Sequence, residues 1–222
     1  VALQILPHHY PIVGSCLIRA IEEVLGSDIA TPEVLQAWGN AYKQLSDILI
    51  GAERVIYEEK AEAVGGWRGA REFEVARRVD ESTEITSFYF VPVDGEAVLD
   101  YTAGQYIGLQ LFINGEETRR NYSLSAIADG IQYRISVKRE PHGVASNFLH
   151  DHVHVGERIN LFTPSGEFTL VDSIKPLVLI SGGVGITPTL AMLETALATS
   201  RPVHFIHCAR NGSVHAFRGW VD

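Results

Sequence analysis

The stretch Pro176-Leu-Val-Leu-Ile-Ser-Gly-Gly-Val-Gly-Ile-Thr-Pro188 carries three local signals in succession. Its apolar part, residues 177–180, favours a strand of a parallel sheet that is covered on both faces. The glycines at 182–185 leave room for a phosphate to approach backbone N–H groups. Pro188 fits the first turn of a following helix, where a missing N–H is tolerated. The stretch predicts a strand, a phosphate-sized loop and a helix, although a structural turn explains such a loop equally well when it is taken alone.

The composition describes a globular chain of 222 residues, 46% of them hydrophobic. This length suffices for about two domains. With 18 basic and 27 acidic side chains, the formal net charge is −9, which argues against nucleic acid or an anionic membrane surface as a partner. No run approaches the roughly 18 to 20 apolar residues that span a bilayer, and no signal-peptide pattern is visible. We therefore expect a cytoplasmic protein without stable membrane insertion. Cys16 and Cys208 lack metal-ligand spacing and are expected to be free buried thiols.

The first zone of the chain, residues 11–63, follows helical spacing. One helix is predicted from Pro11 to a break at Gly26, and a longer one begins at residues 31–33. The apolar side chains of the longer helix recur three and four apart, so one face is predicted to be core. Trp38 and Tyr42 on that face are interpreted as packing residues.

Beyond the linker at residues 65–69, the periodicity changes to two-residue alternation. Strands are predicted within residues 84–93, 105–113 and 133–137, with turn dipeptides such as Asn114-Gly115 between the runs. Short strands at this spacing are typical of a sandwich or barrel. From about residue 174, strand, glycine loop, helix and a further strand alternate, which indicates parallel α/β construction.

A second motif, Arg120-Asn121-Tyr122-Ser123, is predicted at the start of a strand, and residues 137–140 and 143–147 follow it. A flavin needs an aromatic plate, a hydroxyl near N5, a cation for its pyrophosphate and N–H donors for the phosphate oxygens. Tyr122, Ser123 and Arg120 supply the first three, and the loop into a helix at Ser146 supplies the fourth. Taken one at a time, these residues also have a purely structural interpretation, the arginine as an exposed side chain and the tyrosine as a member of a cross-strand pair. The ordered set, together with the glycine loop, favours a flavin site.

These motifs resemble the ferredoxin reductase superfamily, and the helical zone narrows the resemblance to the flavohemoglobin family. The segments at 9–14, 37–42, 56–59 and 65–69 are similar to the last globin helices and the linker of that family. The resemblance covers essentially the whole chain. It implies a multidomain α + β protein, with C-terminal globin helices in residues 1–64, an antiparallel six-stranded FAD-binding β-barrel in residues 65–172, and a truncated parallel α/β nicotinamide domain in residues 173–222.

The resemblance also implies a function, nitric oxide dioxygenase. Nitric oxide is oxidised to nitrate with O2 and NAD(P)H, and electrons pass from nicotinamide through FAD to heme. Tyr10 and Glu53 match the family pair that hydrogen-bonds around the proximal heme histidine, and are the implied catalytic residues. The implied cofactor-binding residues are Tyr106, Arg120, Asn121, Tyr122, Ser123, Val137, Lys138, Glu140, Gly143, Val144, Ala145, Ser146, Gly182, Gly183, Val184, Gly185, Ile186 and Thr187.

By the family pattern the proximal histidine falls just before Val1, and further strands follow Asp222. We therefore expect a fragment of the parent enzyme, inactive alone, with heme b in the parent protein and no metal site in this chain. His8 and His9 are interpreted as surface or cap residues. The three histidines at 150, 152 and 154 are interpreted as solvated rather than as metal ligands.

Two other functions remain open at this stage. A stand-alone FAD-dependent NAD(P)H reductase would use the flavin motif with helices that merely pack. A heme gas sensor would bind O2 or nitric oxide without turnover. Arg210, predicted just after a strand end, is a candidate contact for a nicotinamide phosphate.

Overall fold

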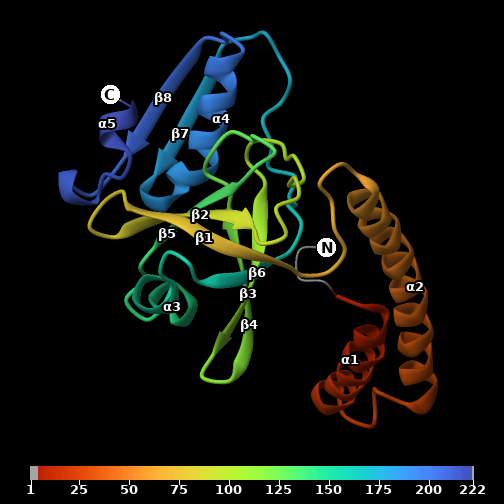
Figure 1. Cartoon of the computed structure of the whole chain (residues 1–222). Helices are drawn as coiled ribbons and strands as arrows, with labels where there is room; N and C mark the ends of the chain where they lie inside the picture. Colours follow the sequence, from red (N-terminus) through yellow and green to blue (C-terminus); the bar gives the residue numbers. More distant parts are fainter. Residues whose placement is uncertain (1–4, 222) are drawn as a thin grey trace. The chain divides into compact units, whose positions relative to one another are not determined.

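The computed structural model describes residues 5–221, which form two compact units, residues 5–59 and residues 60–221 (Figure 1). The first unit holds the 3-10 turn η1 (Pro7–His9), helix α1 (Tyr10–Leu25) and most of α2 (Pro32–Glu62). The second unit holds a six-stranded sheet, a two-stranded sheet and the remaining helices. The division into three domains at residues 64 and 172 stays a prediction.

Helices α1 and α2 are antiparallel neighbours in the first unit and approach closely at Gly14. A Cβ at Gly14 would lie 2.6 Å from Cε1 of Tyr42, so only glycine admits the tyrosine ring there. The Tyr42 hydroxyl donates a hydrogen bond of 2.8 Å to the Tyr10 carbonyl. Pro11 lies at the start of α1 and Gly26, with φ of 71°, caps its end, as the sequence predicts.

The prediction of a core face on the longer helix is wrong for the residues that the structure describes. Trp38 is 50% exposed, and Leu45 and Leu49 of the same face are exposed as well. The physical reason is that α1 is much shorter than α2 and covers only a stripe near Tyr42 and Ser46. Tyr42 does pack as predicted, whereas Trp38 does not.

The six-stranded sheet is antiparallel throughout, in the order β4-β3-β6-β1-β2-β5. Its strands are β1 (Arg71–Asp80), β2 (Ile85–Pro92), β3 (Tyr106–Ile113), β4 (Glu116–Ser123), β5 (Tyr133–Lys138) and β6 (Arg158–Leu161). Aromatic and aliphatic side chains with no exposed surface form the main core of the unit, among them Phe73, Phe88, Ile107, Leu109 and Tyr133. Helix α3 (Val144–His152) follows β5.

The predicted six-stranded barrel is only partly right, because the sheet is not closed. Its edge strands β4 and β5 are not joined by a ladder. The structure instead gives one isolated bridge, Leu124–Ile135, and a hydrogen bond of 2.8 Å from the Ser125 N–H to the Arg134 carbonyl. Leu124 and Ser125 lie immediately beyond the end of β4, where the chain leaves the strand, so the contact with β5 is limited to this one bridge.

The Arg120 motif ends a strand rather than beginning one. Strand β4 starts at Glu116, after a hairpin whose central residues Asn114 and Gly115 have φ of 53° and 83°. Both values are those of the turn that an Asn-Gly pair favours. The first residues of β4 are charged and carry little strand signal, so the sequence analysis places the strand one motif too late.

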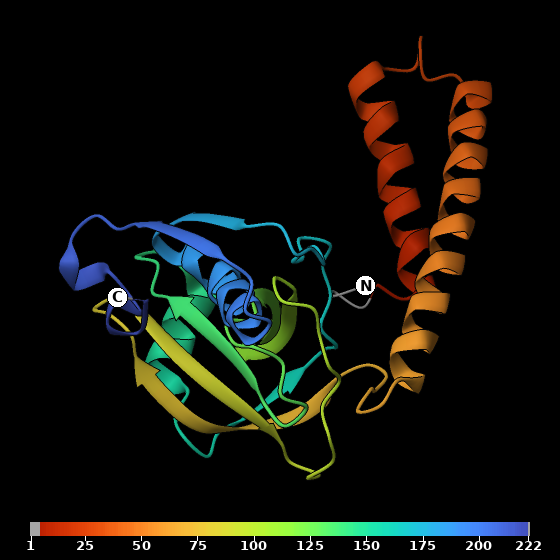
Figure 2. The ribbon, with the colours of Figure 1, turned by 90° about the horizontal axis from the view of Figure 1, so that it is seen from above.

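Residues 177–208 form a parallel βαβ unit, as predicted. It consists of β7 (Leu177–Gly182), the turn η2 (Gly183–Gly185), α4 (Ile186–Ala198) and β8 (Val203–Cys208), and two short helical elements follow, η3 (Gly212–Val214) and α5 (Arg218–Val221). Figures 1 and 2 show α4 lying along one face of β7 and β8. The expectation of cover on both faces is wrong for the described residues, because Leu179 packs against α4 while Val178 and Ile180 are 56% and 68% exposed.

An ion pair ties the large sheet to α4 inside the second unit. Arg134 of β5 lies 3.1 Å from Glu194 of α4, and their side chains are only 12% and 14% exposed. Glu194 also accepts a hydrogen bond of 2.6 Å from the Ile127 N–H. Since both groups are largely desolvated, the pair matters most when one partner is removed.

We expect Glu194→Ala to lower the free energy of unfolding by about 2–3 kcal/mol, because it leaves the Arg134 charge desolvated and the Ile127 N–H without its acceptor. Urea denaturation measures the change. Glu23→Ala is the matched control: its pair with Arg19 is 3.9 Å long and 70% exposed on both sides, so its loss is worth well under ~1 kcal/mol. Equal effects of the two variants would contradict the assignment.

Candidate functional site

A cleft of about 650 Å³ in the second unit collects residues from four separate segments. The end of β4, the end of β5, the first turn of α3 and the start of α4 line it. Its residues are Arg120, Asn121, Tyr122, Ser123, Ser136, Lys138, Glu140, His142, Gly143, Val144, Ala145, Ser146, Val184, Gly185, Thr187 and Pro188. A volume of this size is within the range of cofactor sites.

Most of the predicted cofactor residues meet in this cleft. Five of the predicted residues do not line it: Tyr106, Val137, Gly182, Gly183 and Ile186. Ile186 has no exposed surface and packs in a small core with Leu190 and Phe217. Sequence reasoning missed Ser136, His142 and Pro188, although the alternation along β5 and the position of Pro188 in the first turn of α4 were signals for two of them.

The β4 end of the cleft presents a cation, an aromatic ring and a hydroxyl, in that order along the sequence. Tyr122 is half-buried against the main core, and this burial raises the pKa of its phenol to about 12 against the opposing charge of Arg120. The Arg120 side chain is exposed, and its Nη1 donates to the Arg119 carbonyl at 2.7 Å. Ser123 pairs with Tyr106 across β3 and β4. The ring therefore stays neutral at ordinary pH while the guanidinium remains available to an anion.

The first turn of α3 forms the opposite wall and is held by side chains of its own loop. Ser146 Oγ accepts the Glu140 N–H at 3.2 Å. The Asn147 amide donates to the carbonyls of Glu140 and Gly143 at 3.0 and 2.8 Å. A Cβ at Gly143 would lie 2.3 Å from Ser146 Oγ, so this wall requires glycine. The N-terminal N–H groups of the helix thus face a cleft suited to an anion.

The glycine loop contributes the third wall. Gly183 has φ of 53°, a conformation that favours glycine, and Gly185 is the N-cap of α4. Thr187 Oγ1 donates to the Val184 carbonyl at 3.1 Å. The start of α4 therefore points at the same cleft as the start of α3, which gives the cleft two helix N-termini.

The second predicted pair lies in the first unit. The Tyr10 hydroxyl donates to Glu53 Oε2 at 2.9 Å, joining α1 to α2. Burial, and then Glu53, raises the pKa of Tyr10 to about 12, so the phenol keeps its proton. Tyr10 also lines a separate cavity of about 380 Å³ with Gly14, Tyr42 and Ser46. The role of the pair stays a prediction.

The interpretation of the three histidines of residues 150–154 as solvated is right for two of them and wrong for His150. His152 and His154 are exposed, but His150 is 8% exposed and hydrogen-bonded to the Val137 carbonyl of β5. Three His, Cys, Asp or Glu side chains do not gather as a metal-ligand group anywhere in residues 5–221. His9 accepts the Leu6 N–H at 3.0 Å, which is a cap role as predicted.

The remaining single-residue predictions have mixed outcomes. Cys16 and Cys208 are free but exposed, not buried, because both lie on the open faces of their elements. Arg210 forms an ion pair with Glu84 in this structure. The sequence analysis did not foresee the contact of His207 with Ser181 Oγ at 2.8 Å, at the carboxyl ends of β7 and β8. Among the described helices, none has the length and apolarity to cross a membrane.

The sheet, the cleft and the glycine loop define an FAD-binding oxidoreductase of the ferredoxin reductase type. A model of the oxidoreductase FAD-binding domain matches residues 72–170. The chain is 71% identical to a flavohemoprotein of Pseudomonas putida, over 100% of this chain and 57% of the relative. The chain belongs to the flavohemoprotein family, and it spans a little over half the length of the relatives it matches.

Two solved structures agree with this membership. The flavohem-like FAD/NAD binding domain of nitric oxide dioxygenase from Vibrio cholerae is 42% identical, with a TM-score of 0.66 over 68% of this chain and 67% of that one. The flavohemoglobin of Malassezia yamatoensis with bound FAD and heme is 30% identical, with a TM-score of 0.85 over 98% of this chain and 57% of that one. FAD is accordingly the cofactor of residues 72–170.

Proposed function

We propose that this chain carries the reductase part of a nitric oxide dioxygenase, together with helices that serve its heme. In the whole protein, electrons from NADH or NADPH would reach heme b by way of FAD, and nitric oxide would be oxidised to nitrate with O2. The observation that carries the proposal is the cleft in which the β4 motif, the α3 turn and the glycine loop meet. A cytoplasmic location goes with this function and stays a prediction.

The residues of the cleft fit FAD chemically. A half-buried neutral aromatic ring, a neighbouring hydroxyl, an exposed guanidinium and two helix N-termini form the donor set that a flavin dinucleotide requires. When bound, FAD converts the hydride of a nicotinamide into single electrons. Tyr122 would hold the flavin ring, Ser123 would donate a hydrogen bond to that ring, and Arg120 would neutralise the pyrophosphate. The backbone N–H groups in the first turn of α3 would bind the phosphate oxygens.

The nicotinamide nucleotide would be bound at the start of α4. The loop of residues 182–185 places small side chains beside a helix N-terminus, at the carboxyl end of a parallel strand. Open α/β sheets bind nucleotides at such an edge. Because this loop and the β4 motif share one cleft, the two nucleotides would meet there, which is what hydride transfer needs.

Tyr10 and Glu53 would serve the heme indirectly. Glu53 accepts the Tyr10 proton in a hydrogen bond of 2.9 Å, and the raised pKa of Tyr10 keeps that proton in place. A carboxylate held in this way would orient and polarise the imidazole that binds the heme iron, which would make that imidazole a stronger donor. When bound, heme supplies the iron at which O2 and nitric oxide react.

The absorption spectrum of the purified full-length protein tests this proposal. We expect flavin absorption and a Soret band at about one equivalent each, flavin bleaching on anaerobic addition of NADH or NADPH, and nitric oxide consumption in air. Protein without flavin would refute the assignment of the cleft.

A stand-alone FAD-dependent reductase is the second candidate. One observation favours it: every residue of the cleft lies in the second unit, so the flavin site needs no residue of the helical unit. Flavin reduction by NAD(P)H in a full-length protein that lacks a Soret band would select this function over the dioxygenase.

A further inference from the structure

His150 is a buried histidine that the proposed reaction does not use. It lies in α3, is 8% exposed, and meets the Phe88 ring edge-on at 6.3 Å between ring centroids. Its Nε2 lies 2.9 Å from the Val137 carbonyl of β5. Since a carbonyl oxygen only accepts, Nε2 must carry a proton and donate. His150 is therefore hydrogen-bonded from the helix to the sheet.

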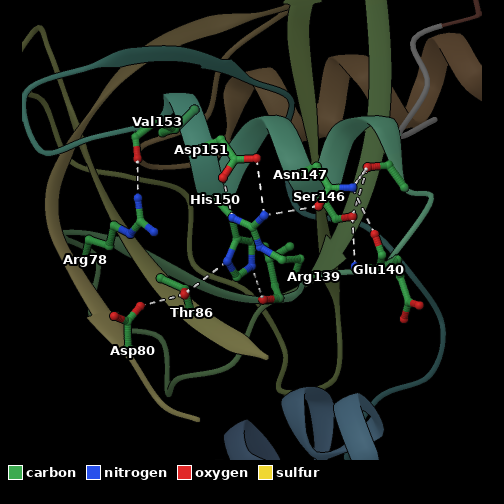
Figure 3. Close-up of polar contacts among 12 residues, drawn as sticks. Arg78, Asp80, Thr86, Arg139, Glu140, Ser146, Asn147, His150, Asp151 and Val153 are labelled. Carbon is green, nitrogen blue, oxygen red and sulfur yellow. Dashed lines mark hydrogen bonds and ion pairs between the residues drawn. The ribbon is translucent and has the colours of Figure 1, made fainter. Parts of the chain in front are cut away.

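The other ring nitrogen, Nδ1, faces the Thr86 hydroxyl, whose proton is already donated elsewhere (Figure 3). Nδ1 lies 3.4 Å from Thr86 Oγ1, and the same hydroxyl donates to Asp80 Oδ1 at 2.7 Å. A hydroxyl has one proton, so Thr86 cannot donate to both. Neutral His150 thus has one good hydrogen bond, to Val137. A second proton at Nδ1 would extend a chain of donors from His150 through Thr86 to Asp80.

Burial of the ring and two of the charges around it oppose that second proton. Four charged side chains face it: Arg78 and Asp80 from β1, Arg139 just after β5, and Asp151 from α3 itself. Burial is the largest cause that lowers the pKa of His150, and Arg139 and Arg78 lower it further, whereas the bond to Val137 and the charge of Asp151 act in the opposite direction. The net direction is downward, so the buried ring is neutral at neutral pH.

The bond from His150 to Val137 joins two walls of the flavin cleft. Val137 directly precedes Lys138, which lines the cleft, and His150 lies one helical turn after Ser146, which lines it too. The Glu140–Ser146 and Asn147–Gly143 bonds fix the loop to α3, but they do not fix α3 to the sheet. The Arg139–Asp151 pair also links helix and β5, yet its side chains are 41% and 46% exposed, so it contributes little.

We infer that His150 is a positioning residue for FAD: in its neutral form it holds α3, whose first turn lines the cleft, against β5, and its protonation at acid pH weakens FAD binding. The inference rests on the proposed flavin site. With α3 packed on β5 the ring resists protonation, whereas a histidine loosened from this position takes a proton near pH 6.5. The packed state therefore binds fewer protons, so its stability falls as pH drops through about 6.5, and the affinity for FAD that the packed α3 provides falls with it.

The test compares FAD binding to the apo form of the full-length protein at pH 7.5 and 5.5, by quenching of FAD fluorescence. For the wild type we expect the Kd to rise about tenfold between these pH values. His150→Gln keeps a donor for Val137 without a titrating ring. Its Kd at pH 7.5 should stay within about threefold of wild type and change less than about threefold with pH. His150→Leu, which has no donor, should bind about tenfold more weakly at pH 7.5.

His152→Gln is the matched control, because His152 is an exposed histidine of the same helix; it should behave like wild type. His142, which lines the cleft, is present in every variant, so the difference in pH slope reports on His150 alone. A slope in His150→Gln equal to that of wild type overturns the inference, even if His150→Leu fails to fold. Absence of FAD binding in both wild type and His152→Gln would instead refute the flavin site itself.

Discussion

Tyr10→Phe combined with Glu53→Ala is expected to lower nitric oxide consumption by the full-length protein about 10- to 100-fold. The two side chains share a hydrogen bond of 2.9 Å between α1 and α2, and burial together with Glu53 keeps the Tyr10 proton in place. Without them, the axial imidazole of the heme would lose the partner that orients it and strengthens it as a donor. A nitric oxide electrode with NADH in air measures the loss.

A control variant and a second measurement distinguish loss of this role from a general folding defect. Glu58→Ala removes an exposed carboxylate from the same helix and should leave turnover unchanged. Flavin reduction by NADH in the double variant should also match wild type, because the flavin cleft lies in the other unit. Turnover that equals wild type would remove the assigned role of the pair, whereas slow flavin reduction would indicate a general folding defect.

Arg120→Ala is expected to raise the Kd for FAD about 10- to 100-fold. The exposed guanidinium stands at the β4 end of the cleft, where it can form charge-assisted hydrogen bonds to the pyrophosphate. Such bonds contribute about 1.5–3 kcal/mol, which corresponds to this range. Titration of the apo-protein with FAD at pH 7.5 measures the effect. Arg120→Lys, which keeps the charge but loses the planar fork, should fall between wild type and Arg120→Ala.

Arg158→Ala provides the comparison for Arg120. Arg158 is an exposed arginine on β6, paired with Glu72 at 3.1 Å and outside the flavin cleft. It has the same net charge effect, so it controls for loss of one positive charge from the protein surface. Equal Kd values for the Arg158→Ala and Arg120→Ala proteins would show that Arg120 acts only through net charge.

Elements with a strong local period were predictable from the sequence. Helix α1 and the start of α2 at Pro32 agree with the predicted positions, because the helical period is visible in consecutive residues. The Asn114-Gly115 turn was predictable for the same reason, since its backbone conformation depends on the two residues themselves. The charged start of β4 was not, because the strand forms through pairing with β3.

Some residues of the candidate site were likewise predictable from the sequence, and others were not. The residue types of the Arg120 motif, the α3 turn and the glycine loop indicated a flavin and a nucleotide, and the structure brings most of them to one cleft. Ser136 and His142 could not be selected in advance, because nothing in their neighbours distinguishes a side chain that faces a cleft. The burial of His150 was equally hidden, since it depends on contacts with Thr86 and Val137, which are far away in the chain.

The sequence by itself determined the family, the type of each long element and the chemical identity of the cofactor motifs, because all of these depend on residue types at short spacing. Only the tertiary structure decided that the sheet stays open between β4 and β5, that Trp38 and Val178 are exposed, and that His150 joins α3 to β5. Each of these depends on which distant segments pack together, and a local period carries no information about that choice.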